Sequence, residues 1–350
     1  MQAFLGVLFH SIGGMAAGSF YMPYTKVKKW EWESYWIVGG LFSWLIIPPI
    51  ASWITVPDFV ELLSSGDFNT LLITYAMGLI WGIGGLSFGL GIRYLGLSLG
   101  NSVALGFSAA FGALVPTIYY NIKPIVGKVS FTDMINSTGG IVVLLGILLC
   151  LIGIGVAGKA GMMKENELSN PEQTNTAVEF NLKKGLLIAA LSGILSSFFS
   201  FGIETGKPLA EAVVKAGFDP LYQNNISFIV ILWGGLTTNF IWTTILSIKN
   251  KSYKDFSDKS SPRLNNVLLS AAAGTIWYLQ FFFYGMGESK LGNGASSWIL
   301  HMSVIILTGN LWGLYRREWS EVSTKTKWTV AYGIGIITLS IVLVGIGNSI

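Results

Sequence analysis

Three residues in one apolar stretch of the chain have side chains suited to binding a polar ligand. Trp277, Gln280 and Tyr284 are spaced i, i+3 and i+7, so they share one face of a helix. The Gln280 amide offers a donor and an acceptor to a ligand hydroxyl, and the two aromatic rings suit the C–H face of a sugar ring. The alternative interpretation is a hydrogen bond from Gln280 to a neighbouring helix.

Two histidines, His10 and His301, lie in apolar stretches in different halves of the chain. A histidine in such surroundings either forms hydrogen bonds between helices or handles protons, and both interpretations remain open. Trp298 precedes His301 by three residues, so it shares a helical face with that histidine. Two histidines and the single Cys150 do not provide a zinc site, so the sequence predicts no metal.

Glu204 is the acidic residue closest to the interior of an apolar stretch. Lys207, at i+3, can form an ion pair with it and end the helix before Pro208. In the alternative interpretation, the Glu204 carboxyl binds a proton or a substrate hydroxyl. Arg93 closes another apolar stretch and is interpreted as an anchor at the membrane edge. Asn101 begins a further stretch, either as a helix N-cap or as a residue that lines the same cavity.

Long apolar helices must position these residues, because every charged residue lies outside ten windows of 19 to 29 residues. The windows are 1–25, 34–57, 68–92, 94–122, 134–158, 185–203, 220–248, 264–287, 291–315 and 328–350. About 20 residues of helix cross a hydrocarbon core of roughly 30 Å. The sequence therefore predicts an all-α polytopic membrane protein with ten transmembrane helices.

The composition agrees with a membrane protein and excludes several other classes. Hydrophobic residues make up 52% of the chain and charged residues 11%, well below the charged share of soluble domains. The sequence has no Walker motif, which excludes ATP as the energy source, and no basic patch for nucleic acid. GIGVAG at 153–158 fits a dinucleotide motif, but its place in an apolar window predicts a helix contact instead. No cofactor is predicted, and no clustered acid–base set indicates an enzyme.

The distribution of basic residues predicts the orientation in the membrane. The loops after the first, third, fifth, seventh and ninth windows hold 17 of the 22 lysines and arginines. The positive-inside rule places these loops in the cytoplasm and both termini outside. Interfacial aromatic belts are expected on both sides of the second window, formed by Trp30, Trp32, Tyr35, Trp36 and Trp53.

The two halves of the chain share motifs in the same order. Trp81 is followed by Leu95-Gly96 after fourteen residues, and Trp277 by Leu291-Gly292 after the same interval. GVLFHSIGG from residue 6 also matches GLLIAALSG from residue 185. We therefore expect a five-helix repeat over 1–158, a polar cytoplasmic linker over 159–183 and a second repeat over 184–350. Because five is odd, the second copy is inverted, as in alternating-access transporters.

Several stretches carry a resemblance to a known family. They include HSIGGMAAGSFYMPYTKVKKWEWE near the start, WYLQFFFYGMG around Gln280 and SWILHMS around His301. The chain resembles the bacterial L-rhamnose–proton symporter family, within the drug/metabolite transporter superfamily. The resemblance implies ten helices in two inverted repeats, located in the bacterial inner membrane, and sugar import driven by protons.

The sequence thus yields one working hypothesis with named roles. The substrate-binding candidates are Trp277, Tyr284, Trp81 and Trp298 for the sugar ring, and Gln280 and Asn101 for its hydroxyls. The proton-coupling candidates are His301 first, then Glu204 and His10, while Lys207 and Arg93 have structural or gating roles. The alternatives are another neutral sugar, sodium coupling, or a membrane sugar sensor that does not transport. The expected partners are a neutral sugar, a proton and the lipid bilayer.

Overall fold

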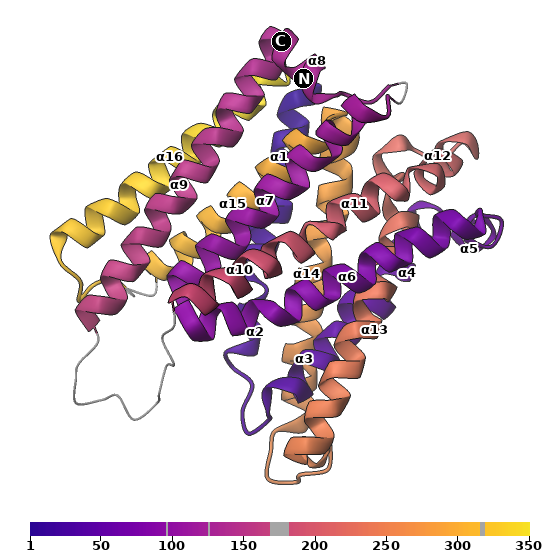
Figure 1. The fold of residues 1–350 in the computed structure, drawn as a ribbon. Coiled ribbons are helices and arrows are strands. Elements are labelled where there is room, and N and C mark those ends of the chain that lie inside the picture. The colour runs from indigo at the N-terminus through magenta and orange to yellow at the C-terminus, as the bar shows by residue number, and fades with distance from the viewer. Residues whose placement is uncertain (96, 125–126, 169–181, 316–318) are drawn as a thin grey trace.

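Helices and the turns between them make up the computed structural model, which describes all residues except 96, 125–126, 169–181 and 316–318 (Figure 1). The elements of the first half are α1 (Gln2–Ser19), α2 (Tyr21–Tyr24), α3 (Trp32–Gly40), the π-helix η1 (Leu41–Ile46), α4 (Ile47–Thr55), α5 (Phe59–Ser64), α6 (Phe68–Leu95), α7 (Leu97–Ile122), α8 (Phe131–Asn136) and α9 (Thr138–Leu168). Those of the second half are α10 (Leu182–Ser196), α11 (Phe198–Thr205), α12 (Lys207–Lys215), the 3-10 helices η2 (Pro220–Tyr222) and η3 (Ser252–Phe256), α13 (Asn225–Asn250), α14 (Arg263–Leu291), α15 (Gly294–Tyr315) and α16 (Thr324–Gly347).

Nine helical segments in the described part of the chain are long and apolar enough to cross a membrane. They coincide with nine of the ten predicted windows, and the remaining window, 291–315, forms the 22-residue helix α15. Only 22 to 44% of the apolar window in each segment is buried inside the protein. Outward-facing apolar surface of this extent is typical of helices surrounded by lipid. The prediction of an all-α polytopic membrane protein is therefore confirmed.

Two three-helix groups form the centre of the bundle. In the first, α1 packs against α14 and α15; in the second, α10 packs against α6 and α7. Small residues allow the close approach: Gly13 of α1 lies against the Gln280 carbonyl of α14. In the second group, the Ser192 hydroxyl of α10 donates a hydrogen bond of 2.8 Å to the Gly84 carbonyl of α6. The two groups therefore use equivalent backbone contacts.

Two further helix pairs are in close contact through glycines. Gly78 of α6 lies against the backbone of α13 beside Gly234, and Gly274 of α14 lies against the backbone of Gly39 in α3. Glycine at these positions removes the side chain that would otherwise separate the helices. As a result, α13 is fixed to α6 and α3 is fixed to α14.

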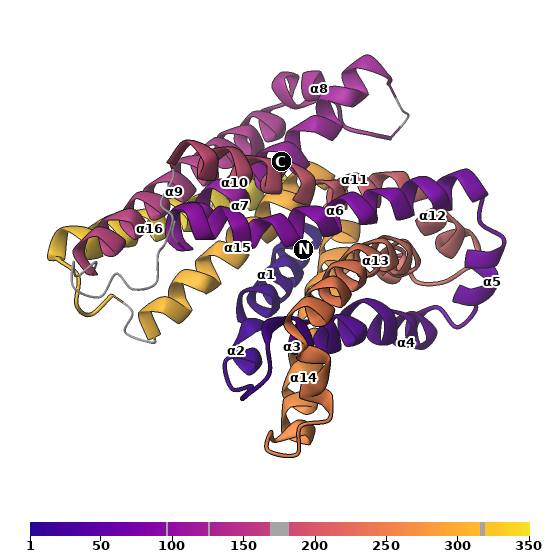
Figure 2. The ribbon, with the colours of Figure 1, turned by 60° about the horizontal axis from the view of Figure 1, so that its bottom comes forward.

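Helices α9 and α16 lie side by side at one edge of the bundle (Figures 1 and 2). Gly139, Gly146 and Gly153 of α9 face the backbone of α16, and the helices run antiparallel. Near the far end of α9, Glu167 accepts a hydrogen bond of 2.5 Å from the Thr326 hydroxyl and one of 2.7 Å from the Ser323 hydroxyl. These bonds, with the Thr326 bond contributing most, lower the pKa of Glu167.

Both chain ends lie at one end of the bundle, where α1 begins and α16 ends (Figure 1). We call this end the terminal face. Gly345 of α16 lies beside Val7 of α1, which brings the last helix to the first. Helix α14 runs toward the same face, because Leu291 near its C-terminus lies against Gly6 of α1.

The structure differs from the sequence-based expectations in three places. Helix α9 continues to Leu168, so the first ten residues of the expected 159–183 linker are helical, and most of the remainder lies outside the described residues. The π-helix η1 interrupts the second span directly before Pro48 and Pro49, whose lack of an N–H alters the hydrogen-bond pattern. The sixth span is divided into α10, α11 and α12, with a break at Gly206 before Lys207.

Two members of the expected aromatic belts around the second span bind other parts of the protein through their indole nitrogens. The Trp30 indole donates to the Asp255 carbonyl at 3.1 Å and the Trp36 indole donates to Asn239 at 3.0 Å. Trp30 is buried and Trp36 is partly buried. Trp53 is 65% exposed, as a residue of a lipid-facing belt should be.

Candidate substrate and proton sites

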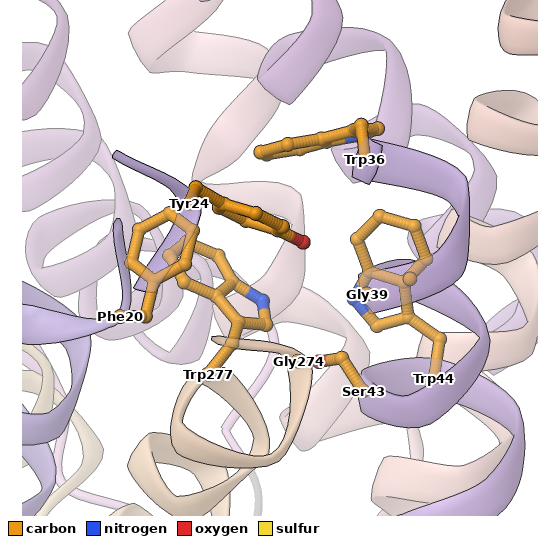
Figure 3. A pocket seen from close by; sticks show the side chains of 9 residues that line it. Phe20, Tyr24, Trp36, Gly39, Ser43, Trp44, Gly274 and Trp277 are labelled. Carbon is orange, nitrogen blue, oxygen red and sulfur yellow. The ribbon is translucent and has the colours of Figure 1, made fainter. Parts of the chain in front are cut away.

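A hollow lined mainly by aromatic side chains lies between α2, α3, η1 and α14 (Figure 3). Its cavity volume is about 10 Å³, which is room for about one water molecule. The lining residues are Phe20, Tyr24, Trp36, Gly39, Gly40, Ser43, Trp44, Gly274 and Trp277. We call this space the aromatic hollow.

Polar atoms at the aromatic hollow have unused hydrogen-bonding capacity. The indole nitrogens of Trp44 and Trp277 and the Ser43 hydroxyl are buried and have no hydrogen-bond partner among the described residues. Figure 3 shows both indole nitrogens and the Tyr24 hydroxyl turned toward the same space. Buried donors without partners cost free energy unless a ligand or water binds them. The hollow can therefore offer ring faces and donors together to a ligand with hydroxyl groups.

Local backbone features create this space. A Cβ atom on Gly39 would overlap the Tyr24 hydroxyl, and one on Gly40 would overlap the Trp44 ring. The π-helix carries Ser43 and Trp44, and such segments are frequent at functional sites. From the opposite side, the Trp277 ring packs on Phe20 with a centroid separation of 4.0 Å.

A cluster of His10, Tyr284 and His301 lies closer to the terminal face. The Tyr284 ring is 5.1 Å from the His10 ring and 5.2 Å from the His301 ring, and the two imidazoles are 5.9 Å apart. All three side chains are at most 3% exposed. Both nitrogens of His10 and Nδ1 of His301 are without a hydrogen-bond partner among the described residues. The two histidines from different halves of the sequence therefore meet, with capacity to bind a proton or a polar ligand.

Gln280 lies between the aromatic hollow and the histidine cluster. It is three residues beyond Trp277 and four before Tyr284 on α14, distances of about 4.5 and 6 Å along the axis. Its side chain is 4% exposed, and its Nε2 is buried without a partner among the described residues. The helix–helix hydrogen bond considered from the sequence is therefore not made by this amide nitrogen.

Trp81 and Trp298 pack beside the site. The Trp298 indole donates to the Ser108 carbonyl of α7 at 2.8 Å, which occupies its donor and fixes α15 to α7. Trp81 contacts Phe281 at a centroid separation of 5.9 Å and Trp44 at 6.4 Å. Trp81 therefore packs against both Trp44 and Phe281 beside the site.

An ion-pair cluster lies near the terminal face, beyond the histidines. Lys207 is 2.5 Å from Glu288, and the Asn224 amide donates to the second oxygen of Glu288 at 2.6 Å. Glu204 is 2.5 Å from Lys128 and accepts a hydrogen bond of 2.5 Å from the Tyr120 hydroxyl. The cluster thus contains two acids and two bases, and its net charge is zero. Its side chains are largely withdrawn from solvent at one end of the bundle.

The ion pair expected from the sequence between Glu204 and Lys207 is not the one formed. The chain breaks its helical path at Gly206, so the two side chains do not share one face of a continuous helix. Lys207 instead pairs with Glu288 of α14, and Glu204 pairs with Lys128 from the other half of the chain. Asn101 and Arg93 lie outside the residues whose side chains are described.

Sequence reasoning missed Glu288 because the charge-free window ended one residue before it. The signal was present: Glu288 is eleven residues after Trp277 and four after Tyr284, on the face already identified as functional. Phe20, Tyr24 and Trp44 had no comparable signal, because their meeting depends on the packing of three separate elements.

The fold defines a polytopic α-helical membrane protein in which aromatic and polar side chains cluster between the helices. The family model described as L-rhamnose-proton symport protein (RhaT) matches residues 2–350. The L-rhamnose-proton symporter of Citrobacter koseri is 40% identical over 348 residues, which cover 98% of this chain and 97% of that protein. The proteins of the same name from Escherichia coli O45:K1 and Shigella flexneri are also 40% identical over the same shares.

The chain therefore belongs to the L-rhamnose-proton symport protein family, as its resemblance in sequence predicted. This is a family of transporters and not of enzymes.

Proposed function

We propose that this protein imports L-rhamnose, or a closely similar neutral deoxyhexose, together with protons by alternating access. The aromatic hollow carries the proposal, because it combines ring faces with buried donors that lack partners. A deoxyhexose presents a C–H face and a methyl group to rings and hydroxyls to donors. None of the residues that line the hollow carries a charge, which favours a neutral substrate over a phosphate or a nucleotide.

In the proposal, the aromatic hollow widens from the described conformation, in which it has a volume of about 10 Å³, and the sugar that enters it extends toward Gln280. Trp277 contacts the sugar ring, and the Gln280 amide binds a hydroxyl. Tyr284 bounds the site on the side of the histidines. Trp81 supports the walls, and Trp298 acts through packing, since its indole donor is already engaged by Ser108.

The proton-binding group belongs, in this proposal, to the segment between the aromatic hollow and the terminal face. The three candidates from the sequence, His301, Glu204 and His10, all lie in this segment. His10 and His301 have nitrogens with no partner among the described residues, which suits a transient proton or water contact. Glu204 is held by Lys128 and Tyr120.

The proposed architecture consists of ten spans in two inverted repeats, with α15 as the ninth span. Similar contacts support it: Gly13 of α1 meets Gln280 of α14 in one helix group, and Ser192 of α10 meets Gly84 of α6 in the other. An offset of 179 residues relates Gly13 to Ser192, and one of 196 relates Gly84 to Gln280. The 196-residue offset also relates Trp81 to Trp277, so the same two offsets describe both the sequence motifs and the packing.

Proton movement can supply enough energy for accumulation of the sugar. One charge crossing 100 mV releases about 2.3 kcal/mol. At about 1.4 kcal/mol for each tenfold ratio, this supports roughly 40-fold accumulation. The absence of a nucleotide motif in the sequence is consistent with this energy source.

Uptake of labelled L-rhamnose into proteoliposomes tests the proposal. We expect uptake to rise with an inward proton gradient and with a negative interior voltage. Uptake that ignores both gradients but follows sodium would replace the coupling ion. Binding without counterflow across the vesicle would show a sensor, and transport of another neutral sugar in preference to L-rhamnose would change the substrate.

The proposed orientation has both termini outside the cell, on the basis of the 17 basic residues in the odd-numbered loops. A membrane-impermeant label on a cysteine introduced at Gln2 should react in intact cells. Reaction only after membrane disruption would reverse the orientation, and with it the side from which the terminal face is reached.

A further inference from the structure

We propose that Glu288 is the proton-controlled gate of this transporter, and that its protonation releases Lys207 and opens the terminal face. The inference rests on the proposed proton symport and names the group that couples the proton to the movement. Glu288 is 4% exposed on α14 and binds Lys207 of α12 and Asn224 at the start of α13.

The position of this ion pair in the bundle is the first argument. Helix α14 belongs to the group of α1 and α15, whereas α12 follows the group of α10, α6 and α7. The Lys207–Glu288 pair therefore joins the two groups across the terminal face. The Glu204–Lys128 pair joins α11 to the segment after α7, which belong to the same group. Neutralising Glu288 would remove this ion pair between the groups and leave the Trp298–Ser108 contact of α15 with α7 in place, whereas neutralising Glu204 would remove no ion pair between the groups.

The geometry of the site gives the second argument. Glu288 is eleven residues beyond Trp277 on one helix, about 16 Å along the axis. The proton site and the aromatic hollow thus lie at different depths on α14, and both are connected to any movement of that helix. A Cβ atom on Gly287 would lie 2.7 Å from the His10 ring. Because α1 and α14 pack this closely beside Glu288, a movement of α14 there also moves α1.

The charges around Glu288 provide the third argument, because Lys207 has a second acid available. The titratable and polar groups that surround Glu288 on the packed elements are Lys207, Asn224, Tyr284, Tyr120, Glu204 and His10. Glu204 interacts electrostatically with Lys207 in the present arrangement. When Glu288 is neutral, the Lys207 ammonium can turn to Glu204, which lies in its own group of helices. A buried lysine is then never left without a carboxylate, a condition that would be costly.

The steps balance in charge and in protons. The incoming proton binds the Glu288 carboxylate and forms a neutral carboxylic acid, which no longer holds the ammonium. Lys207 keeps its own proton and changes partner. While Glu288 is neutral, the terminal face can both open and close over the bound sugar. Release of the proton on the opposite side restores the carboxylate, and the re-formed Lys207–Glu288 pair then holds the terminal face closed.

Glu288→Gln mimics the protonated state and provides the main test. In proteoliposomes at about 100 mV, the wild type can accumulate L-rhamnose roughly 40-fold. We expect Glu288→Gln to keep rhamnose counterflow but to lose accumulation against a gradient. The matched control is Glu211→Gln, which alters an acid of α12 that is 64% exposed and paired with Lys215. This control should accumulate rhamnose like the wild type.

The outcomes separate this inference from the proposed function. If the wild type shows no proton-dependent rhamnose uptake, the proposed function fails. If the wild type is proton-coupled and Glu288→Gln still accumulates rhamnose fully, the gate assignment is overturned while the function stands. Loss of both counterflow and accumulation in a folded Glu288→Gln protein would also overturn it, because a gate held neutral should still exchange sugar.

A second measurement does not depend on the folding of a Glu288 variant. Spin labels on cysteines at Glu211 of α12 and Lys290 of α14 would report the separation of the two groups, and Cys150 is fully buried and stays unlabelled. We expect the distance distribution to lengthen on acidification. A distribution that is identical at neutral and acidic pH would overturn the gate.

Discussion

Replacement of Gln280 by leucine separates ligand binding from protein stability. The two side chains are similar in size, and the Nε2 atom of Gln280 has no partner among the described residues. Leucine therefore removes a buried, unpaired donor, and the unfolding temperature should stay the same or rise. In the sugar complex, the same change leaves a ligand hydroxyl without its partner.

The expected loss of affinity follows from the cost of one unmade hydrogen bond. A buried polar group without a partner costs about 1–3 kcal/mol. At about 1.4 kcal/mol for each factor of ten, Gln280→Leu should weaken rhamnose binding by roughly 5- to 150-fold. Titration calorimetry of the purified protein measures this change, and thermal unfolding of the same samples measures stability.

A matched control lies on the same helix. The Tyr278 hydroxyl is also buried without a partner among the described residues, but Tyr278 does not line the aromatic hollow. Tyr278→Phe should leave both the affinity for rhamnose and the stability close to those of the wild type. An affinity of Gln280→Leu within twofold of the wild type would refute the role of Gln280 in the site.

Three further predictions follow from the packing and the site. Trp277→Ala should weaken rhamnose binding about tenfold, or by about 1.4 kcal/mol, because a ring contact is lost. Trp328 is 59% exposed, so Trp328→Ala should leave the affinity measured in the same titration unchanged. Gly13→Ala should lower the free energy of unfolding by about 1–3 kcal/mol through overpacking, because its Cβ would lie 2.9 Å from a carbonyl oxygen. Gly155 has open space around it, so Gly155→Ala is the control in thermal unfolding. The protection factors for hydrogen exchange in the first turn of α16, which are corrected for the intrinsic exchange rate at each pH, should fall as the pH falls through the lowered pKa of Glu167, since the stabilising bonds need the carboxylate. Glu167→Gln should make these protection factors independent of pH in that range, and an unchanged pH response in the variant would contradict the assignment.

The sequence was sufficient for the features that depend on local composition. Each charge-free window coincides with helix in the structure, because exclusion of charge from lipid acts residue by residue. The face of Trp277, Gln280 and Tyr284 could be predicted for the same reason, since helical spacing is a local property.

Features that depend on packing between distant segments could not be predicted. The sequence predicted an interfacial position for Trp36 but gave no sign that its indole binds Asn239, more than two hundred residues away. Glu204 is the acid nearest to Lys207 in the sequence. Because the helix breaks at Gly206 and α14 lies close by, Lys207 forms its ion pair with Glu288 instead. In both cases, the decisive partner lies on another helix, and sequence spacing carries no information about it.

The glycine contacts between α9 and α16 restrict how this pair can move. Gly139, Gly146 and Gly153 recur every seven residues and fit against the α16 backbone, an interval of about 10 Å along the axis. Sliding one helix by a single turn, about 5.4 Å, would press branched side chains onto the opposing backbone. Translation along this seam is therefore blocked, and the two helices must travel as a single rigid arm that turns about its contact with the rest of the bundle.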